Sequence, residues 1–177
     1  MPRRAPRLLN AQELFEYAVK RLAARAHSKG ELREKLRRKA EHEEDVETVL
    51  RRLEEFKYLD DRKFAESYAA ARLEDQQLGA RRVVRDLRAR RVAPSLAEQT
   101  VGRVYGNVDE EALIEDYLRR KYHSADSFQD QKGLASAYGR LLRAGFTPGL
   151  IIRVLRKFTR QPDLLDGFEP PETPPEE

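Results

Sequence analysis

The ionisable residues fall into two groups, a few histidines that could transfer protons or bind metal and many arginines that could bind phosphate. The three histidines, His27, His42 and His123, lie far apart in predicted turns or linkers, and none has a second ligand at metal-site spacing. We interpret them as capping or surface residues. Acidic residues occur in capping runs and on solvated faces, not alone in apolar pockets where burial could tune a pKa for catalysis.

The sequence also lacks the motifs of common enzyme classes. It contains no phosphate-binding glycine loop and no Gly-x-Ser-x-Gly motif. Because the chain has no cysteine, disulfides, thiolate catalysis and cysteine-rich zinc sites are excluded. We therefore expect a protein that is not an enzyme and has no catalytic residues, no cofactor and no metal.

Basic residues are the more informative group. The 177 residues include 35 Lys and Arg and 31 Asp and Glu, a net charge of +4. Residues 162–177 contain six acidic residues and five prolines but no basic residue, so the remaining body has 35 basic and 25 acidic residues. A body this basic favours a polyanionic partner. Solubility or thermal adaptation is the alternative explanation for so much charge.

One predicted helix presents arginines on a single side. Arg81, Arg85 and Arg88 follow at i, i+4 and i+7, about a third of a turn from Val84 and Leu87. The helix can thus bury one face and expose a row of guanidinium groups, whose planar forks suit phosphate and carboxylate. Solvated helix faces are the simpler alternative. The residues that we predict to bind the partner are Arg81, Arg82, Arg85, Arg88, Arg90, Arg91, Arg33, Lys35, Arg37, Arg38, Arg140, Arg143, Arg153 and Lys157.

The helices that carry these residues form an all-α pattern that repeats three times. The second and third copies superimpose at an offset of 54 residues, so that Leu87 falls on Leu141 and Pro94 on Pro148. We predict three tandem three-helix units of helix-turn-helix type. The predicted segments are a flexible basic arm at 1–10, repeats at 11–58, 59–106 and 107–160, and an acidic, proline-rich disordered tail at 161–177.

Local signals predict where two of the helices begin. Ser28 with Glu31 three residues later forms a capping box. Asp60 is predicted to cap the first helix of the second repeat, with Leu59 and Phe64 placed to form a hydrophobic staple.

The start of the second repeat also carries a family resemblance. Tyr58-Leu59-Asp60-Asp61, followed by Phe64-Ala65-x-x-Tyr68 and Arg72, resembles the hallmark of the RecX family. The segments that resemble its flanking repeats are Arg25-x-x-Ser28-x-x-Glu31-Leu32-x-x-Lys35-Leu36 and Ala144-Gly145-Phe146 through Val154-Leu155. The resemblance covers roughly residues 14–158.

This resemblance implies an elongated, curved array of three three-helix repeats. It also implies a non-enzymatic regulator that binds the groove of the RecA recombinase–DNA filament and mainly inhibits its ATPase, strand exchange and growth, in recombination, DNA repair and the SOS response. The residues predicted above would then contact this filament. A helix-turn-helix transcriptional regulator and a protein-binding helical scaffold are the alternatives.

The remaining expectations concern partners and location. We expect a monomer that binds single- and double-stranded DNA weakly and without sequence preference. The apolar runs are far shorter than the ~20 residues of a membrane span, and the N-terminus lacks a signal-like apolar segment, so we expect a cytoplasmic protein with no membrane contact. The acidic tail is expected to compete with polyanions for the basic body.

Overall fold

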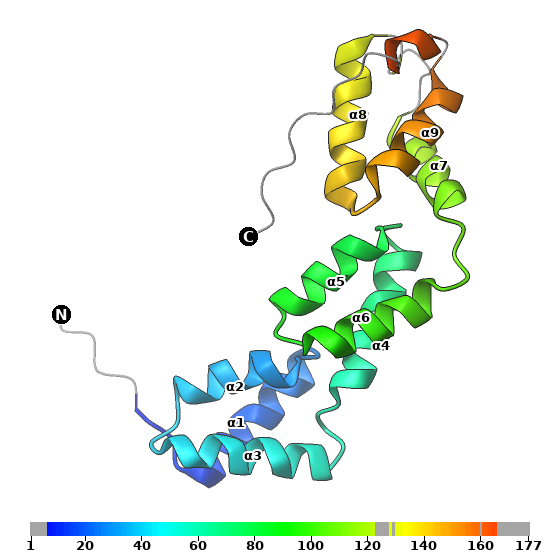
Figure 1. Cartoon of the computed structure of the whole chain (residues 1–177). Coiled ribbons are helices and arrows are strands. Elements are labelled where there is room, and N and C mark those ends of the chain that lie inside the picture. The colour runs from blue at the N-terminus through cyan, green and yellow to red at the C-terminus, as the bar shows by residue number, and fades with distance from the viewer. Residues whose placement is uncertain (1–6, 123–127, 129, 160, 166–177) are drawn as a thin grey trace, which may run out of the picture. The chain divides into compact units, whose positions relative to one another are not determined.

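A computed structural model describes residues 7–122, 128, 130–159 and 161–165. Over these residues the secondary structure is helical, apart from one isolated bridge between Leu9 and Ala40, which confirms the predicted all-α fold of tandem three-helix repeats (Figure 1). The helices are α1 Ala11–Ala24, α2 Lys29–Arg37, α3 Glu43–Glu55, α4 Asp61–Glu74, α5 Ala80–Ala89, α6 Pro94–Tyr105, α7 Glu110–Lys121, α8 Gln131–Ala144, α9 Pro148–Phe158 and the short 3-10 helix η2 Pro162–Leu165.

The chain divides into two compact units that do not coincide with the repeats. The first unit is Met1–Tyr68 with Asp86–Val101, and the second is Ala69–Arg85 with Gly102–Glu177. The division passes through α4, α5 and α6, so the second repeat contributes a part of each of its helices to both units.

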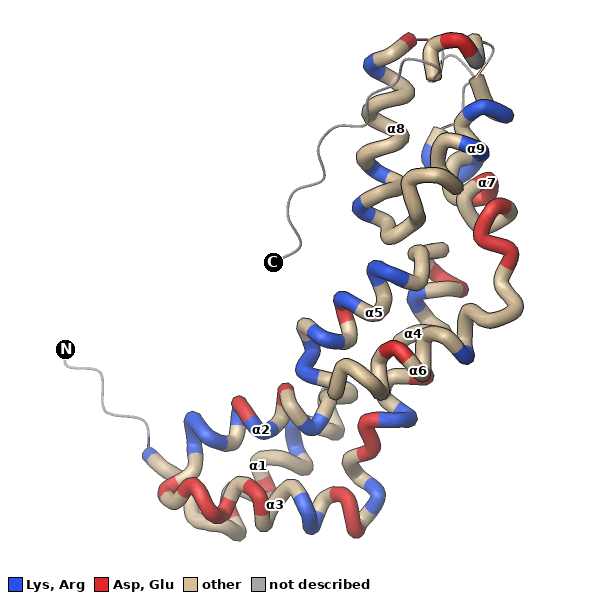
Figure 2. The backbone as a smooth tube through the Cα atoms, in the orientation of Figure 1, with Lys and Arg blue, Asp and Glu red and all other residues tan. Residues whose placement is uncertain are grey.

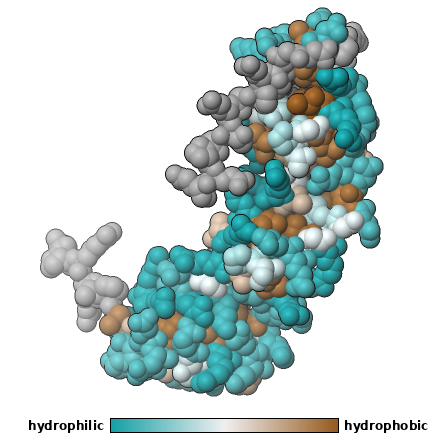
Figure 3. All heavy atoms as spheres, in the orientation of Figure 1, coloured by the Kyte–Doolittle hydropathy of each residue, from teal (hydrophilic) through white to brown (hydrophobic). Residues whose placement is uncertain are grey.

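In the first unit, α1, α2 and α3 pack around one apolar core. Val46, Val49, Leu50 and Leu53 follow the i, i+3, i+4, i+7 spacing of one face of α3. All four are buried, at 3% exposure or less, and Leu14 and Leu36 pack against them. Figure 3 shows hydrophilic residues over most of the visible face of this part of the molecule, with small hydrophobic patches between them. The core residues are Leu14, Ala18, Leu32, Leu36, Val46, Val49, Leu50, Leu53 and Leu59.

The predicted caps of the first unit are present. Ser28 Oγ accepts a 3.0 Å hydrogen bond from the Glu31 N–H, and Glu31 Oε2 accepts one from the Ser28 N–H, which completes the capping box. Asp60 Oδ1 accepts hydrogen bonds from the N–H groups of Arg62 and Lys63 at 3.0 and 3.1 Å. Polar groups at these helix starts are therefore satisfied locally.

In the second unit, α7 and α8 pack against α9. Tyr138, Phe146 and Leu155 are among its buried residues, and Phe146 contacts the ring of Tyr117 edge to face. Pro148 occupies the first position of α9, where its missing N–H costs no hydrogen bond, and Thr147 at the N-cap makes no side-chain capping bond.

Two predicted segment boundaries need correction. The end of the proposed flexible arm is held in place, because the Leu9 N–H donates to the Lys39 carbonyl at 2.8 Å and Asn10 caps α1 with Glu13 as its capping-box partner. The proposed disordered tail begins too early, because Pro162–Leu165 form η2 and Leu165 is buried in the core of the second unit. Residues 166–177 lie outside the described part of the chain.

One histidine also differs from its prediction. His27 is 4% exposed rather than on the surface, and its Nδ1 lies 2.9 Å from the Arg25 carbonyl oxygen. His42 stands at the N-cap of α3 without a side-chain capping bond, and His123 falls outside the described residues. None of the described helices has the length and apolar character that crossing a membrane requires.

Candidate functional site

Helix α5 has the two-sided character that the sequence predicts. Leu87 is fully buried, and Val83 rather than Val84 is the second fully buried residue, whereas Arg81, Arg85 and Arg88 are exposed. Figure 2 shows basic residues along this helix, and its sequence contains a single acidic residue, Asp86. The burial of one apolar face therefore holds the arginine row at the surface.

Three predicted arginines at the end of α5 are engaged in ion pairs within the first unit. Arg88 pairs with Glu98 of α6. Arg90 Nη1 lies 3.3 Å from Glu31 Oε1, and Arg91 Nη2 lies 3.7 Å from Glu34 Oε2. Carboxylates of the same unit already balance these charges.

Most of the predicted basic residues of α2 are paired as well. Arg33 donates two hydrogen bonds to the carboxylate of Glu47, at 2.6 and 3.0 Å, and this contact raises the pKa of Arg33 and lowers that of Glu47. Arg37 pairs with Glu43 at 3.3 Å, and Arg38 lies 4.0 Å from Glu34. Lys35 makes no ion pair with a described residue.

The basic residues of α9 form a compact ion cluster with α7. Arg153 Nη1 and Lys157 Nζ lie 2.7 and 2.8 Å from the two carboxylate oxygens of Glu111, and Lys157 also lies 3.3 Å from Glu115. The hydrogen bond from Lys157, which has the largest effect, and the one from Arg153 lower the pKa of the Glu111 carboxyl group. Both predicted partner-binding residues thus bridge two helices of their own unit.

Four of the arginines predicted to bind the partner, all exposed and in the second unit, remain without a carboxylate partner among the described residues. Arg81 and Arg85 belong to α5, and Arg140 and Arg143 belong to α8. We call these four residues the arginine cluster. Arg140 lies over the ring of Tyr122, 5.8 Å from its centroid, so one face of its guanidinium group contacts an aromatic ring.

Hydrogen bonds hold the start of α5 against the end of α8, the two helices that carry the arginine cluster. The Gly79 N–H, directly before α5, donates a 2.8 Å hydrogen bond to the Ala144 carbonyl at the end of α8. Arg82 Nη1 donates to the Arg143 carbonyl at 3.3 Å. Gly145 adopts φ +98°, a left-handed conformation that ends α8 and permits this close approach.

The sequence therefore identifies the basic residues but does not indicate which of them are paired. Glu111 and Arg153 are 42 residues apart, and no local spacing indicates that they meet. The offset of 54 places Arg90 and Ala144 at equivalent positions, at the ends of α5 and α8, but it does not indicate that the end of α8 meets the start of α5.

Comparison with known proteins identifies similar chains. A family model described as the first three-helix domain of RecX matches residues 15–53, and a model of the second three-helix domain of RecX matches residues 60–101. These matches fall within residues 11–58 and 59–106, the segments proposed as the first two repeats.

Two curated relatives extend the similarity over most of the chain. The regulatory protein RecX of Amycolatopsis mediterranei (strain U-32) is 33% identical over 140 residues, which cover 79% of this chain and 79% of the relative. The regulatory protein RecX of Deinococcus radiodurans is 34% identical over 148 residues, or 82% of this chain and 68% of the relative.

A solved structure supports the same fold. The crystal structure of RecX from Lactobacillus salivarius aligns with a TM-score of 0.65 at 19% identity, over 84% of this chain and 96% of that one.

Proposed function

Because the chain belongs to the RecX family of regulatory proteins, we propose that it regulates the RecA recombinase by binding the RecA–DNA filament. In this proposal the bound protein mainly inhibits ATP hydrolysis, strand exchange and filament growth. Such a partner presents phosphates and protein carboxylates, which are the groups that guanidinium forks bind best.

The arginine cluster is the observation that carries this proposal. Its four residues are exposed and lack carboxylate partners among the described residues, so their charge is available to an anionic partner. Hydrogen bonds between Gly79 and Ala144 and between Arg82 and Arg143 fix the two helix ends that carry them. Little backbone ordering is then needed on binding, which favours affinity.

The other predicted basic residues have a supporting role in this proposal. Arg33 and Arg153 each hold a carboxylate at 2.7 Å or less, so binding through them would require breaking an existing pair. Exposed pairs of this kind contribute little stability, about 0–1 kcal/mol, but they do cancel charge. Among the predicted arginines, the charge that is available to phosphate therefore concentrates at the arginine cluster.

We further propose that the protein acts as a cytoplasmic monomer that binds DNA alone only weakly. Contacts made by arginine to phosphate position a protein without reading sequence, so single and double strands of any sequence should bind. The affinity should fall steeply with salt because bound phosphates release counterions.

Single-stranded-DNA-dependent ATP hydrolysis by RecA of the same organism tests the proposed function. The protein is titrated from well below one copy per RecA monomer, with DNA and ATP held constant. Inhibition at substoichiometric ratios is expected, because blocking filament growth affects many RecA monomers at once. If hydrolysis is unchanged at equimolar protein while bare DNA still binds, the proposed function is wrong and a DNA-binding regulator becomes the better explanation.

A further inference from the structure

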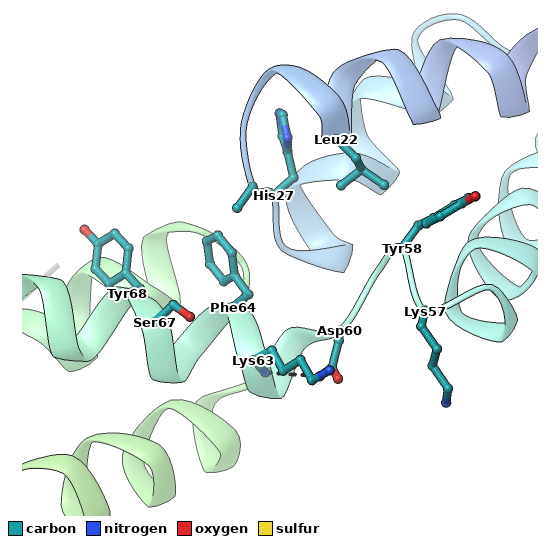
Figure 4. A pocket seen from close by; sticks show the side chains of 10 residues that line it. Leu22, His27, Lys57, Tyr58, Asp60, Lys63, Phe64, Ser67 and Tyr68 are labelled. Atoms are coloured by element: carbon teal, nitrogen blue, oxygen red, sulfur yellow. Dashed lines mark hydrogen bonds between the residues drawn. The ribbon is translucent and has the colours of Figure 1, made fainter.

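An aromatic groove lies in the first unit, well apart in sequence from the arginine cluster. It has a volume of about 460 Å³ and is open to solvent. This volume falls within the roughly 300–1,000 Å³ of known ligand sites. Figure 4 shows Tyr58, on the connection before α4, and Phe64, in the first turn of α4, on opposite sides of this groove.

The ring of Tyr58 is held outward by the backbone. Lys57 adopts φ +59°, its N–H donates to the Glu54 carbonyl, and the Tyr58 N–H donates to the Leu53 carbonyl at 2.9 Å. These two bonds form a Schellman motif at the end of α3. Tyr58 is 57% exposed and Phe56 is 54% exposed, although large apolar rings are usually more buried.

Aromatic contacts continue on both sides of the groove. On one side Tyr58 contacts Phe56, with ring centroids 6.0 Å apart, and Arg52 lies over the Phe56 ring at 5.6 Å. On the other side Phe64 stacks with Tyr68, with centroids 6.1 Å apart and ring planes 25° apart. Arg90 lies over the Tyr68 ring at 4.9 Å. The groove thus lies between two pairs of aromatic rings, and an arginine lies over one ring of each pair.

The charge around the groove favours an anion. Lys57 and Lys63 line it and make no ion pair with a described residue. Asp60 is the single carboxylate among its lining residues, and its Oδ1 is occupied by two backbone N–H groups of α4. His27 also lines it, and burial lowers the pKa of this imidazole, so it adds no charge at neutral pH.

We propose that this groove binds single-stranded nucleic acid, with a base stacked against Tyr58 and Phe64 and phosphates next to Lys57 and Lys63. Flat bases match aromatic rings on both sides, and the backbone phosphates match the two lysines. Stacking does not depend on base identity, so the site takes any sequence. The proposal rests on the DNA binding proposed above and deepens it by assigning a second site at other residues, and it is tested without RecA.

The test compares binding of two fluorescently labelled oligonucleotides to the full chain at low salt. One is an oligothymidylate of about twelve nucleotides, and the other has the same backbone without bases. Stacking predicts that the abasic strand binds more weakly. Tyr58→Ala should weaken oligothymidylate binding by roughly five- to a hundred-fold, whereas Tyr58→Phe keeps the ring and should bind within about twofold.

Two further readouts separate stacking from simple charge. The chain has seven tyrosines and no tryptophan, so tyrosine fluorescence is directly visible, and its quenching by oligothymidylate should be smaller in Tyr58→Phe. Replacing Lys57 and Lys63 by alanine should lower the salt slope of binding by about 1.4. Equal affinity of Tyr58→Ala and the wild-type chain would overturn the proposal. Binding of an acidic peptide, together with no binding of either oligonucleotide, would overturn the proposal and assign the groove to a protein partner.

Discussion

The backbone N–H of Gly79 donates a 2.8 Å hydrogen bond to the carbonyl oxygen of Ala144, 65 residues further along the chain. An equivalent contact occurs in the first unit, where the Ser28 hydroxyl donates to the carbonyl oxygen of Arg90. Arg90 and Ala144 are related by the offset of 54 residues, and Ser28 and Gly79 both immediately precede the second helix of their repeats. The same junction between successive second helices is thus built twice.

The junction in the second unit predicts a large effect of one methyl group. A Cβ atom at Gly79 would lie 2.5 Å from the Gly145 carbonyl oxygen, a backbone atom that cannot move alone. We expect Gly79→Ala to lower the free energy of unfolding by about 1–3 kcal/mol. Gly102→Ala is the control, because nothing lies within 4 Å of its Cβ position, and it should stabilise α6 by about 0.5–1 kcal/mol. Urea denaturation measures the free energy of unfolding of both variants. Equal changes in the two would show that the close approach at Gly79 does not limit stability.

The junction in the first unit predicts that replacing the capping residue Ser28 lowers the stability of the protein. Ser28 Oγ accepts from the Glu31 N–H and donates to the Arg90 carbonyl, so Ser28→Ala removes two contacts at once. We expect a loss of about 1–2 kcal/mol in the free energy of unfolding. Thr147→Ala is the matched control, since Thr147 occupies an N-cap without a capping bond and should change stability by less than about 0.5 kcal/mol. A similar loss in both variants would argue against this assignment.

His27 predicts a pH dependence of stability. Burial holds the pKa of its imidazole below the ordinary 6.5, so the unfolded chain binds the proton more readily than the folded one. Its contribution to stability is therefore complete above about pH 6.5 and is lost as pH falls toward the lower folded-state pKa, with a slope of at most about 1.4 kcal/mol per pH unit.

His27→Asn provides the comparison for this prediction. Its amide can still donate to the Arg25 carbonyl, which His27 Nδ1 contacts at 2.9 Å, but it does not titrate. Urea denaturation between pH 5 and 7 should show a shallower pH dependence in the variant. Parallel curves for both proteins would show that His27 does not control this dependence.

The helices and their starts could be predicted because short-range patterns determine them. The spacing of Val46, Val49, Leu50 and Leu53 predicts a buried stripe on α3, and all four are buried. Capping by Ser28 likewise depends on residues within one helical turn. The resemblance to RecX likewise depends on short segments, one of which contains Ser28.

Contacts between distant residues could not be predicted in the same way. His27 was expected at the surface, yet tertiary packing buries it, because a turn residue carries no periodic signal of its side-chain environment. The pairing of Lys157 with Glu111 likewise joins residues 46 positions apart. The sequence identifies the basic residues, but only the packed helices show which of their charges are already balanced.

The most direct test of the proposed role of the arginine cluster compares two double variants that each lose two positive charges. The measured quantity is their affinity for filaments of RecA on single-stranded DNA. Replacing Arg81 and Arg85 by glutamine removes two charges that have no carboxylate partner among the described residues, whereas replacing Arg153 and Lys157 removes two that pair with Glu111. We expect the first variant to bind at least about tenfold more weakly and the second to bind within about threefold of the wild-type chain. Equal losses in both variants would contradict the account, because total charge rather than the arginine cluster would then determine binding.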